Sequence, residues 1–305
     1  MNRAQVQFRV VDVEALIPED HPARAIWEFV GRVDLSRYTE EIRAVEGGAG
    51  RPAYDPQLLV SLWIYSYSQG VTSARAIERL CTHDPAYQWL TGLAGISAHT
   101  LSDFRMAHGD ALREVFIQAL GVLRAAGLIT LERVMQDGTR IRASAASKRF
   151  HRKARIHEAL REARAHVEAL EALPEDEGSR QQQKARERAR REKVERLEAA
   201  LQAFEQLEAT KSTVDRVSTT DPDARVMKQA EGGAAPSYNM QLSTDASHQL
   251  IVGIEVTQAG SDYQQLLPGL DGIAQNMGTL PAQVVVDGGY LSSDNIVEVA
   301  ARGVE

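Results

Sequence analysis

The sequence is poor in cysteine and has no long hydrophobic run. Cys81 is its only cysteine, which excludes an internal disulfide and is typical of a reducing compartment. No apolar stretch approaches the roughly 18 residues that cross a bilayer, so we expect no membrane partner. The first 22 residues lack the apolar core of a signal peptide, and we therefore expect a cytoplasmic protein.

The sequence also lacks an excess of positive charge. Its formal net charge is −7, whereas a protein whose whole surface binds nucleic acid is usually basic. Any contact with nucleic acid must therefore come from local basic patches. The length of 305 residues, 43% of them hydrophobic, suits a globular chain of about two domains.

Residues 1–127 form the first predicted domain, and its pattern is mostly helical. Asp55 precedes an apolar helix at 56–69, with proline at the first helical position. Shorter helices at about 74–81, 84–90 and 97–108 follow, separated by tight turns. Such spacing is typical of helix-turn-helix modules, but a plain helical bundle has the same pattern, and both interpretations stay open.

Residues 128–305 form the second predicted domain, in which β-type patterns surround a helical insertion. Strands are predicted at 134–141, 238–244, 250–257 and 283–286. The insertion at 149–212 carries apolar residues at three- and four-residue spacing in two runs, broken at 174–179, which predicts an antiparallel helical hairpin. The whole chain is thus predicted to combine an all-helical N-terminal domain with an α/β (α+β) domain built on a mixed sheet.

Two aspartates are the candidate site of the second domain. Asp137 and Asp287 each end an apolar run and are each followed by glycine. We expect both carboxylates to be held rigidly at strand ends, with Gly138, Gly288 and Gly289 leaving open space for a phosphate. Mg²⁺ binds a few carboxylate oxygens and keeps waters for phosphate, and a pair of such ions stabilises displacement at phosphorus. Either aspartate alone could be a turn former, but the pair favours a metal site.

Basic residues follow the first aspartate strand, and we predict that they contact DNA phosphates. They are Lys148, Arg149, Arg152, Lys153 and Arg155, with Arg225 and Lys228 further on. The alternative is the solvated start of a helix, but the sequence offers the cluster no acid before Glu158. Asp245 and Asp262 are interpreted as turn and cap residues. Tyr290 is predicted to pack on the sheet.

Six short motifs, in this order and spacing, resemble insertion-sequence DDE transposases of the branch with a helical insertion in an RNase H-like domain. They are residues 17–22 (IPEDHP), the block from 50–52 (GRP), 137–141 (DGTRI), 221–228 (DPDARVMK), 238–241 (YNMQ) and 287–290 (DGGY). The resemblance runs through nearly the whole chain.

The resemblance implies a function for each domain. Asp137 and Asp287 would be the first two members of a metal-binding acidic triad, using Mg²⁺ or Mn²⁺. The implied activity is cleavage of DNA at the ends of a bacterial insertion sequence, followed by attack of the freed 3′-hydroxyl on target DNA. The N-terminal helices would help to hold double-stranded element ends. The implied state is a homo-oligomer on DNA, associated with the nucleoid, with no small-molecule substrate.

The sequence departs from the family at the third acidic residue. In the family, this glutamate lies on a helix beyond a further strand, downstream of the second aspartate. Only Glu298 and Glu305 follow Asp287, and neither fits that order. We therefore expect a C-terminally truncated transposase in which the final strand and the glutamate-bearing helix are missing, and whether the chain is an active enzyme stays open.

Two alternative functions remain. A non-catalytic DNA-binding protein could occupy element ends and inhibit transposition. A hydrolase of the same sheet type could act on other phosphoesters.

Overall fold

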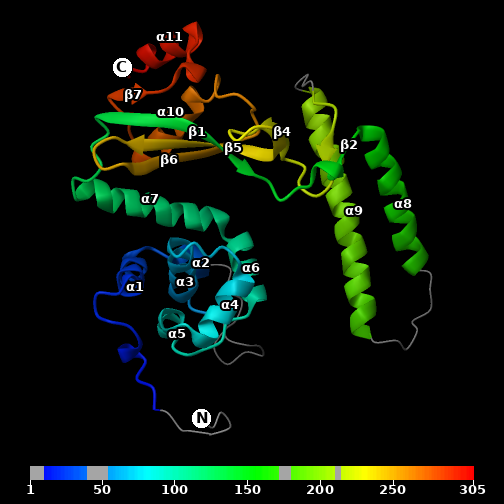
Figure 1. Ribbon diagram of the computed structural model, residues 1–305, viewed down its shortest axis with the longest axis horizontal. Helices are drawn as coiled ribbons and strands as arrows, with labels where there is room; N and C mark the ends of the chain where they lie inside the picture. The colour runs from blue at the N-terminus through cyan, green and yellow to red at the C-terminus, as the bar shows by residue number, and fades with distance from the viewer. Residues whose placement is uncertain (1–9, 40–53, 172–179, 210–213) are drawn as a thin grey trace. The chain divides into compact units, whose positions relative to one another are not determined.

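The computed structural model describes residues 10–39, 54–171, 180–209 and 214–305 (Figure 1). The chain divides into two compact units, Met1–Leu123 and Arg124–Glu305. Two features of the sequence analysis lie outside the described residues. They are the GRP motif at 50–52 and the predicted break at 174–179.

The first unit is helical. Its elements are η1 (Glu14–Leu16), α1 (Pro22–Arg32), α2 (Ser36–Thr39), α3 (Pro56–Ser68), α4 (Ala74–His83), α5 (Pro85–Thr91), α6 (Ala98–Ala107) and most of α7 (Gly109–Ala125). Helix α3 supplies much of the core, and the carboxylate of Asp55 caps it by accepting from the Gln57 N–H at 2.8 Å. Trp63 of α3 is buried, and its indole N–H donates to the Leu101 carbonyl at 3.2 Å.

The second unit contains a five-stranded mixed sheet, which confirms the predicted combination of helices and a mixed sheet. Its strands are β1 (Arg133–Arg142), β4 (Arg225–Lys228), β5 (Ala234–Asp245), β6 (Leu250–Thr257) and β7 (Gln283–Val285). Strand β1 pairs antiparallel with β5 on one side and parallel with β7 on the other. Strands β4 and β6 both pair antiparallel with β5. The predicted hairpin of β5 and β6 is also confirmed.

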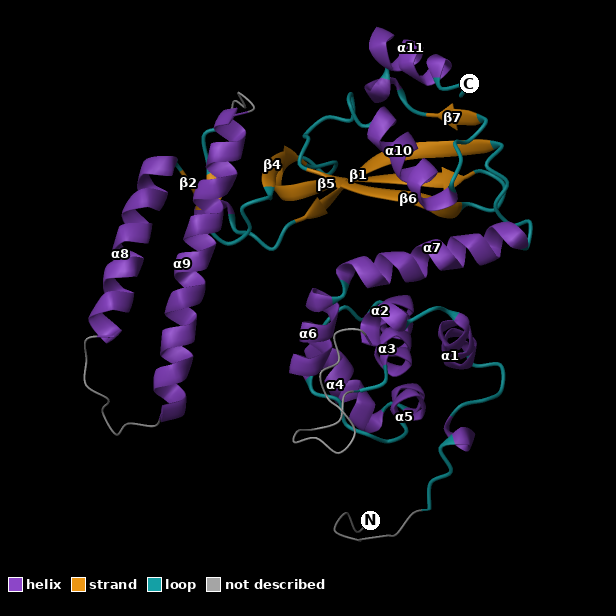
Figure 2. Cartoon of the chain, turned by 180° about the vertical axis from the view of Figure 1, so that it is seen from behind, coloured by secondary structure: helices purple, strands orange, loops and turns teal. Residues whose placement is uncertain are grey.

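Helix α10 (Leu266–Met277) packs against β5 and β6 and crosses one face of the sheet (Figure 2). Its apolar side chains pack into the core of this unit, where Leu270 and Ile273 are fully buried. Along β1 burial alternates, since Val134 and Gln136 are buried whereas Met135 and Asp137 are exposed. Helix α11 (Ser293–Ala301) follows β7 and contacts α10.

Helices α8 (Lys153–Glu171) and α9 (Arg180–Ala209) pack along apolar stripes. Ile156 and Leu160 of α8 share a buried cluster with Leu201 and Phe204 of α9, as the three- and four-residue spacing predicts. At the base of the pair, β2 (Phe150–His151) and β3 (Val217–Ser218) form a two-stranded antiparallel sheet. The insertion thus has its own core and a paired base.

Hydrogen bonds from neighbouring segments fix the beginnings of β1 and β7. Asp245 is fully buried, and its carboxylate accepts from the backbone N–H groups of Thr130 at 3.1 Å and Leu131 at 2.9 Å, just before β1 begins. At the outer edge of β7, the Glu305 N–H donates to Ala282 at 2.9 Å, and the Val284 N–H donates to Glu305 at 2.8 Å. Strands β1 and β7 are therefore hydrogen-bonded at their beginnings as well as along the sheet.

None of the helices in the described part of the chain combines the length and apolar character that a bilayer crossing requires.

Candidate functional site

Asp137 lies in the middle of β1, so the expectation that it ends a strand is wrong. The strand continues to Arg142 because Gly138 and Thr139 pair with Gln241 and Met240 of β5. Cross-strand pairing therefore outweighs the turn tendency of the Asp–Gly dipeptide. The Asp137 side chain is exposed, and Oδ1 accepts from the Gly138 N–H at 2.7 Å.

Asp287 follows the end of β7 by two residues. It is the N-cap of the short helical turn η3 (Gly288–Tyr290), and its Oδ1 accepts from the Gly289 N–H at 2.8 Å. This side chain is also exposed. Asp287 therefore combines a fixed backbone with a carboxylate that faces solvent.

The sheet register relates the segments that lead to the two aspartates. Met135 lies opposite Val285 in the parallel pair, and each aspartate comes two residues later in its chain. Neighbouring strands are about 4.8 Å apart, and residues two apart share a face of the sheet. The pairing itself ends at Met135 and Val285, and continuation of its register predicts that Asp137 and Asp287 lie near each other on one face.

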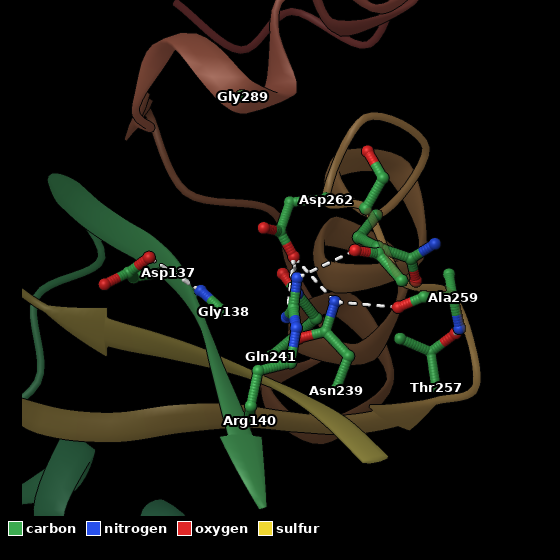
Figure 3. A network of polar contacts seen from close by, with 12 residues as sticks. Asp137, Gly138, Arg140, Asn239, Gln241, Thr257, Ala259, Asp262 and Gly289 are labelled. Carbon is green, nitrogen blue, oxygen red and sulfur yellow. Dashed lines mark hydrogen bonds and ion pairs between the residues drawn. The ribbon is translucent and has the colours of Figure 1, made fainter. Parts of the chain in front are cut away.

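A polar network lies on the other side of β1 from the Asp137 carboxylate (Figure 3). Its centre is Asp262, whose Oδ1 accepts from Asn239 Nδ2 at 2.6 Å and from Gln241 Nε2 at 2.7 Å. Arg140 approaches the same oxygen at 3.5 Å and donates to the Gly260 carbonyl at 3.1 Å. Gln241 also accepts from the Tyr290 hydroxyl at 2.5 Å.

The interpretation of Asp262 as a helix cap is wrong. Gln265 is the residue before α10, and no side chain caps that helix. The carboxylate of Asp262 instead accepts hydrogen bonds from side chains of β5. Two buried amides and a nearby guanidinium satisfy this carboxylate better than a single helix N–H would.

Gly138 does not leave open space, contrary to expectation. A Cβ added there would come within 2.5 Å of both Asp262 Oδ1 and Gln241 Nε2. Position 138 requires glycine because the polar network occupies the space in which a side chain would lie. Gly288 has no atom within 4 Å of such a Cβ, so there the expectation of space is confirmed. A Cβ added at Gly289 would lie 3.0 Å from Asp287 Oδ1.

The charges around the network shift two pKa values. Burial raises the pKa of Asp262, but the hydrogen bonds from Asn239 and Gln241 and the charge of Arg140 outweigh it, so the pKa lies below its ordinary value. Burial raises the pKa of Tyr290, and the charges of three carboxylates raise it further. These are Asp262, Asp137 and Asp287. Tyr290 is buried, as predicted, beside both aspartates of the pair.

The pair has the chemistry that a hard divalent cation needs. Each aspartate uses one oxygen for a nearby backbone N–H, and neither is in an ion pair with any described residue. Mg²⁺ commonly takes one or two protein carboxylates and fills its other positions with water and phosphate. Within residues 10–39, 54–171, 180–209 and 214–305, no group of three or more His, Cys, Asp or Glu could hold a metal.

The predicted phosphate-binding cluster is partly engaged in ion pairs. Arg152 lies 3.4 Å from Asp215 and Lys153 lies 2.6 Å from Glu208, while Arg155 pairs with Glu158. The argument that no acid precedes Glu158 is therefore incomplete, because folding brings acids from distant positions. Lys148 and Arg149 lie in η2 (Ser147–Arg149), where both are exposed.

The other two predicted DNA contacts differ in exposure. Arg225 is buried, with Nη1 donating to Pro222 at 2.7 Å and Nη2 donating to Gln258 Oε1 at 2.8 Å. Lys228 is exposed at the end of β4. Of these two, Lys228 is the one placed to contact a phosphate without rearrangement.

Sequence reasoning missed Gln241 as part of the site. The signal that could have found it is an alternation of polar residues in β5, where Ser237, Asn239, Gln241, Ser243 and Asp245 occupy every second position. All five are buried. Such a polar row on the buried face of a strand indicates a hydrogen-bonded network.

Residues 11–107 match a family described as Transposase domain (DUF772). The match covers the described helices of the first unit from η1 to α6. No curated protein and no solved structure matches the chain. The likeness to a transposase family therefore rests on the helical unit.

Proposed function

We propose that the chain is a DDE-type transposase component whose Asp137 and Asp287 hold Mg²⁺ or Mn²⁺ against a DNA phosphate. The observation that carries this proposal is the parallel pairing of Met135 with Val285, since an exposed aspartate follows each of them by two residues. The transposase family matched by residues 11–107 supports the same function from an independent part of the chain. The mixed sheet interrupted by a helical pair agrees with the RNase H-like fold that the resemblance implies.

The two aspartates would divide their oxygens between protein and cation. In each, one oxygen accepts from a backbone N–H, and the other oxygen would bind the cation. A bound divalent cation would supply charge stabilisation to the attacking and leaving oxygens at phosphorus. Gly288 keeps side-chain atoms away from the space beside Asp287.

DNA would be held by basic side chains outside the aspartate pair. In the second unit, Lys148, Arg149 and Lys228 are exposed. In the first unit, Arg75 and Arg79 are exposed one turn apart on α4. Such groups contact phosphates, and binding would weaken steeply as salt rises. Binding of element ends and target DNA by a homo-oligomer belongs to the same proposal.

The test measures Mn²⁺ binding by the full chain with electron paramagnetic resonance. Asp137→Asn and Asp287→Asn should each lower Mn²⁺ affinity at least tenfold, because each removes half of the anionic ligand set. Glu298→Gln is the matched control, since Glu298 interacts with Arg302 on α11. Equal Mn²⁺ affinity in wild type and both aspartate variants would refute the metal site.

A second experiment separates cleavage from mere binding. The full chain is mixed with Mn²⁺ and duplex DNA taken from the flanks of its own gene. Cleavage that either aspartate variant abolishes supports the enzyme. Salt-sensitive DNA binding that both variants retain, without cleavage, supports instead the alternative of a DNA-binding protein that occupies element ends. This alternative agrees with the finding that no three His, Cys, Asp or Glu among the described residues are grouped so that they could hold a metal.

A further inference from the structure

The polar network behind β1 connects the segments that carry the two aspartates. Asp137 belongs to β1, which pairs with β5 along nearly its whole length. Asp287 is the N-cap of η3 and comes two residues after the last residue of β7. The parallel pairing of β1 with β7 stops at Met135 and Val285, two residues before the aspartates. Something other than the strand ladder must therefore hold Asp287 in place.

Gln241 makes the link through both ends of its amide. Its Nε2 donates to Asp262 Oδ1 at 2.7 Å and to Asn239 Oδ1 at 3.0 Å. Its Oε1 accepts from the Tyr290 hydroxyl at 2.5 Å and from Gln136 Nε2 at 3.4 Å. The side chain is 2% exposed, so water cannot replace these partners without a rearrangement.

Asp262 determines which way the Gln241 amide points. A carboxylate can only accept, so it must face the amide N–H₂ group. The amide oxygen then faces Tyr290, which must donate its hydroxyl proton. A flipped amide would set its oxygen against the charged Asp262, and this repulsion excludes the second orientation. Arg140, 3.5 Å from the same carboxylate, stabilises the charge.

Tyr290 connects the Gln241 amide to the turn that contains Asp287. Its backbone N–H donates to the Asp287 carbonyl at 3.3 Å, and its own carbonyl accepts from Asn295 Nδ2 at 2.7 Å. The ring is 1% exposed. With its hydroxyl held by Gln241 and its backbone held by α11, the tyrosine leaves the η3 turn little freedom to move.

The geometry points to Gln241 as a positioning residue that, through Tyr290, holds Asp287 in register with Asp137 for the shared cation. This inference rests on the proposed function and adds to it the group that aligns the two ligands. Gln241 and Tyr290 are not themselves ligands here, because the Gln241 amide and the Tyr290 hydroxyl are hydrogen-bonded to each other and the amide also binds Asp262. Loss of a residue that supports a metal ligand typically lowers metal affinity about 10-fold or more.

The test removes one hydroxyl from the full chain. Tyr290→Phe keeps the ring and its packing but loses the bond to Gln241. We expect faster hydrogen exchange in residues 284–292 and about tenfold weaker Mn²⁺ binding by electron paramagnetic resonance. The matched control is Tyr263→Phe, whose ring is 50% exposed and which should change neither measurement.

A second variant tests whether the residues act as a unit. Gln241→Met keeps the length of the side chain and removes both hydrogen-bonding ends. The double variant with Tyr290→Phe should lose no more Mn²⁺ affinity than the worse single variant, because the two changes break the same link. Independent, additive losses would overturn the inference.

The outcomes separate the inference from the proposed function. If wild type and Asp137→Asn bind Mn²⁺ equally, the proposed metal site is refuted. Hydrogen exchange of residues 284–292 in Tyr290→Phe then still reports whether Gln241 holds the turn. If Asp137→Asn loses Mn²⁺ but Tyr290→Phe matches wild type in affinity, the metal site stands and the positioning role of Gln241 is overturned. Faster exchange with unchanged affinity overturns it too.

Discussion

The Asp–Gly dipeptides at 137–138 and 287–288 are alike in sequence and different in structure. Asp137-Gly138 lies in a long central strand that is paired on both sides near its start. Asp287-Gly288 lies in a turn after a strand of three residues. At the first pair the glycine is crowded by Asp262 and Gln241, whereas at the second it faces open space.

The difference teaches that one dipeptide can meet two separate physical demands. Gly138 lacks a side chain because a buried network occupies the space behind it. Gly288 lacks one where a ligand would need room. The first aspartate is positioned by the β-ladder, and the second depends on a turn held by side chains. Substitutions near the two pairs should therefore have different consequences for folding.

The largest expected effect concerns the start of β1. Asp245→Ala removes a buried carboxylate and leaves the N–H groups of Thr130 and Leu131 without their acceptor. We expect a loss of about 3 kcal/mol in the unfolding free energy of the second unit, because hydrogen bonds to a charged group contribute about 1.5–3 kcal/mol each and are not additive. Calorimetry measures it.

The first unit provides an internal control for that measurement. All three tryptophans, Trp27, Trp63 and Trp89, lie in residues 1–123. Tryptophan fluorescence therefore follows the first unit alone and should be unchanged in Asp245→Ala. A calorimetric transition of the second unit equal to that of wild type would show that Asp245 is not needed to hold β1.

A smaller effect is expected from alanine at the two glycines. In Gly138→Ala the new Cβ would lie 2.5 Å from two atoms of the network, so the variant should lose about 2 kcal/mol of unfolding free energy. Gly288→Ala meets nothing within 4 Å and should change it by less than about 0.5 kcal/mol. Urea unfolding monitored on the second unit measures both. Equal losses would remove the distinction between the two dipeptides.

The smallest effect is a pH dependence at Asp262. Its pKa is lower in the folded protein than in the unfolded chain, so its contribution to stability is fully present above about pH 4 and is lost as the pH falls through the folded pKa. Asp262→Asn should therefore destabilise the protein more at pH 7 than at pH 3. Thermal unfolding at the two pH values measures this, and a difference from wild type that is the same at both would contradict the assignment.

The sequence predicts the broad fold well because its signals are local. Caps such as Asp55, the apolar spacing of the insertion and the hairpin of β5 and β6 depend on residues near one another in the chain. The aspartate pair is also visible, since each follows an apolar run. These local patterns predict where helices and strands lie along the chain.

The network behind the pair could not be predicted in the same way. In β5, apolar Met240 and Leu242 alternate with polar Asn239 and Gln241, and the usual rule would bury the apolar row. Here the polar row is buried and the apolar row is half-exposed, because Asp262 and Tyr290 come from distant segments to satisfy it. Which row faces inward depends on partners that no local pattern contains.

The paired base of the helical insertion has a consequence for how such chains can vary. Phe150 and Ser218 are held opposite each other by β2 and β3, and the Thr219 N–H donates to the Arg149 carbonyl at 3.1 Å. The two ends of the insertion thus meet at one place, while the hydrophobic cluster of α8 and α9 is satisfied internally. The insertion is therefore attached to the rest of the unit at one place, so a change in the length of α8 and α9 would leave the order of the five strands unchanged.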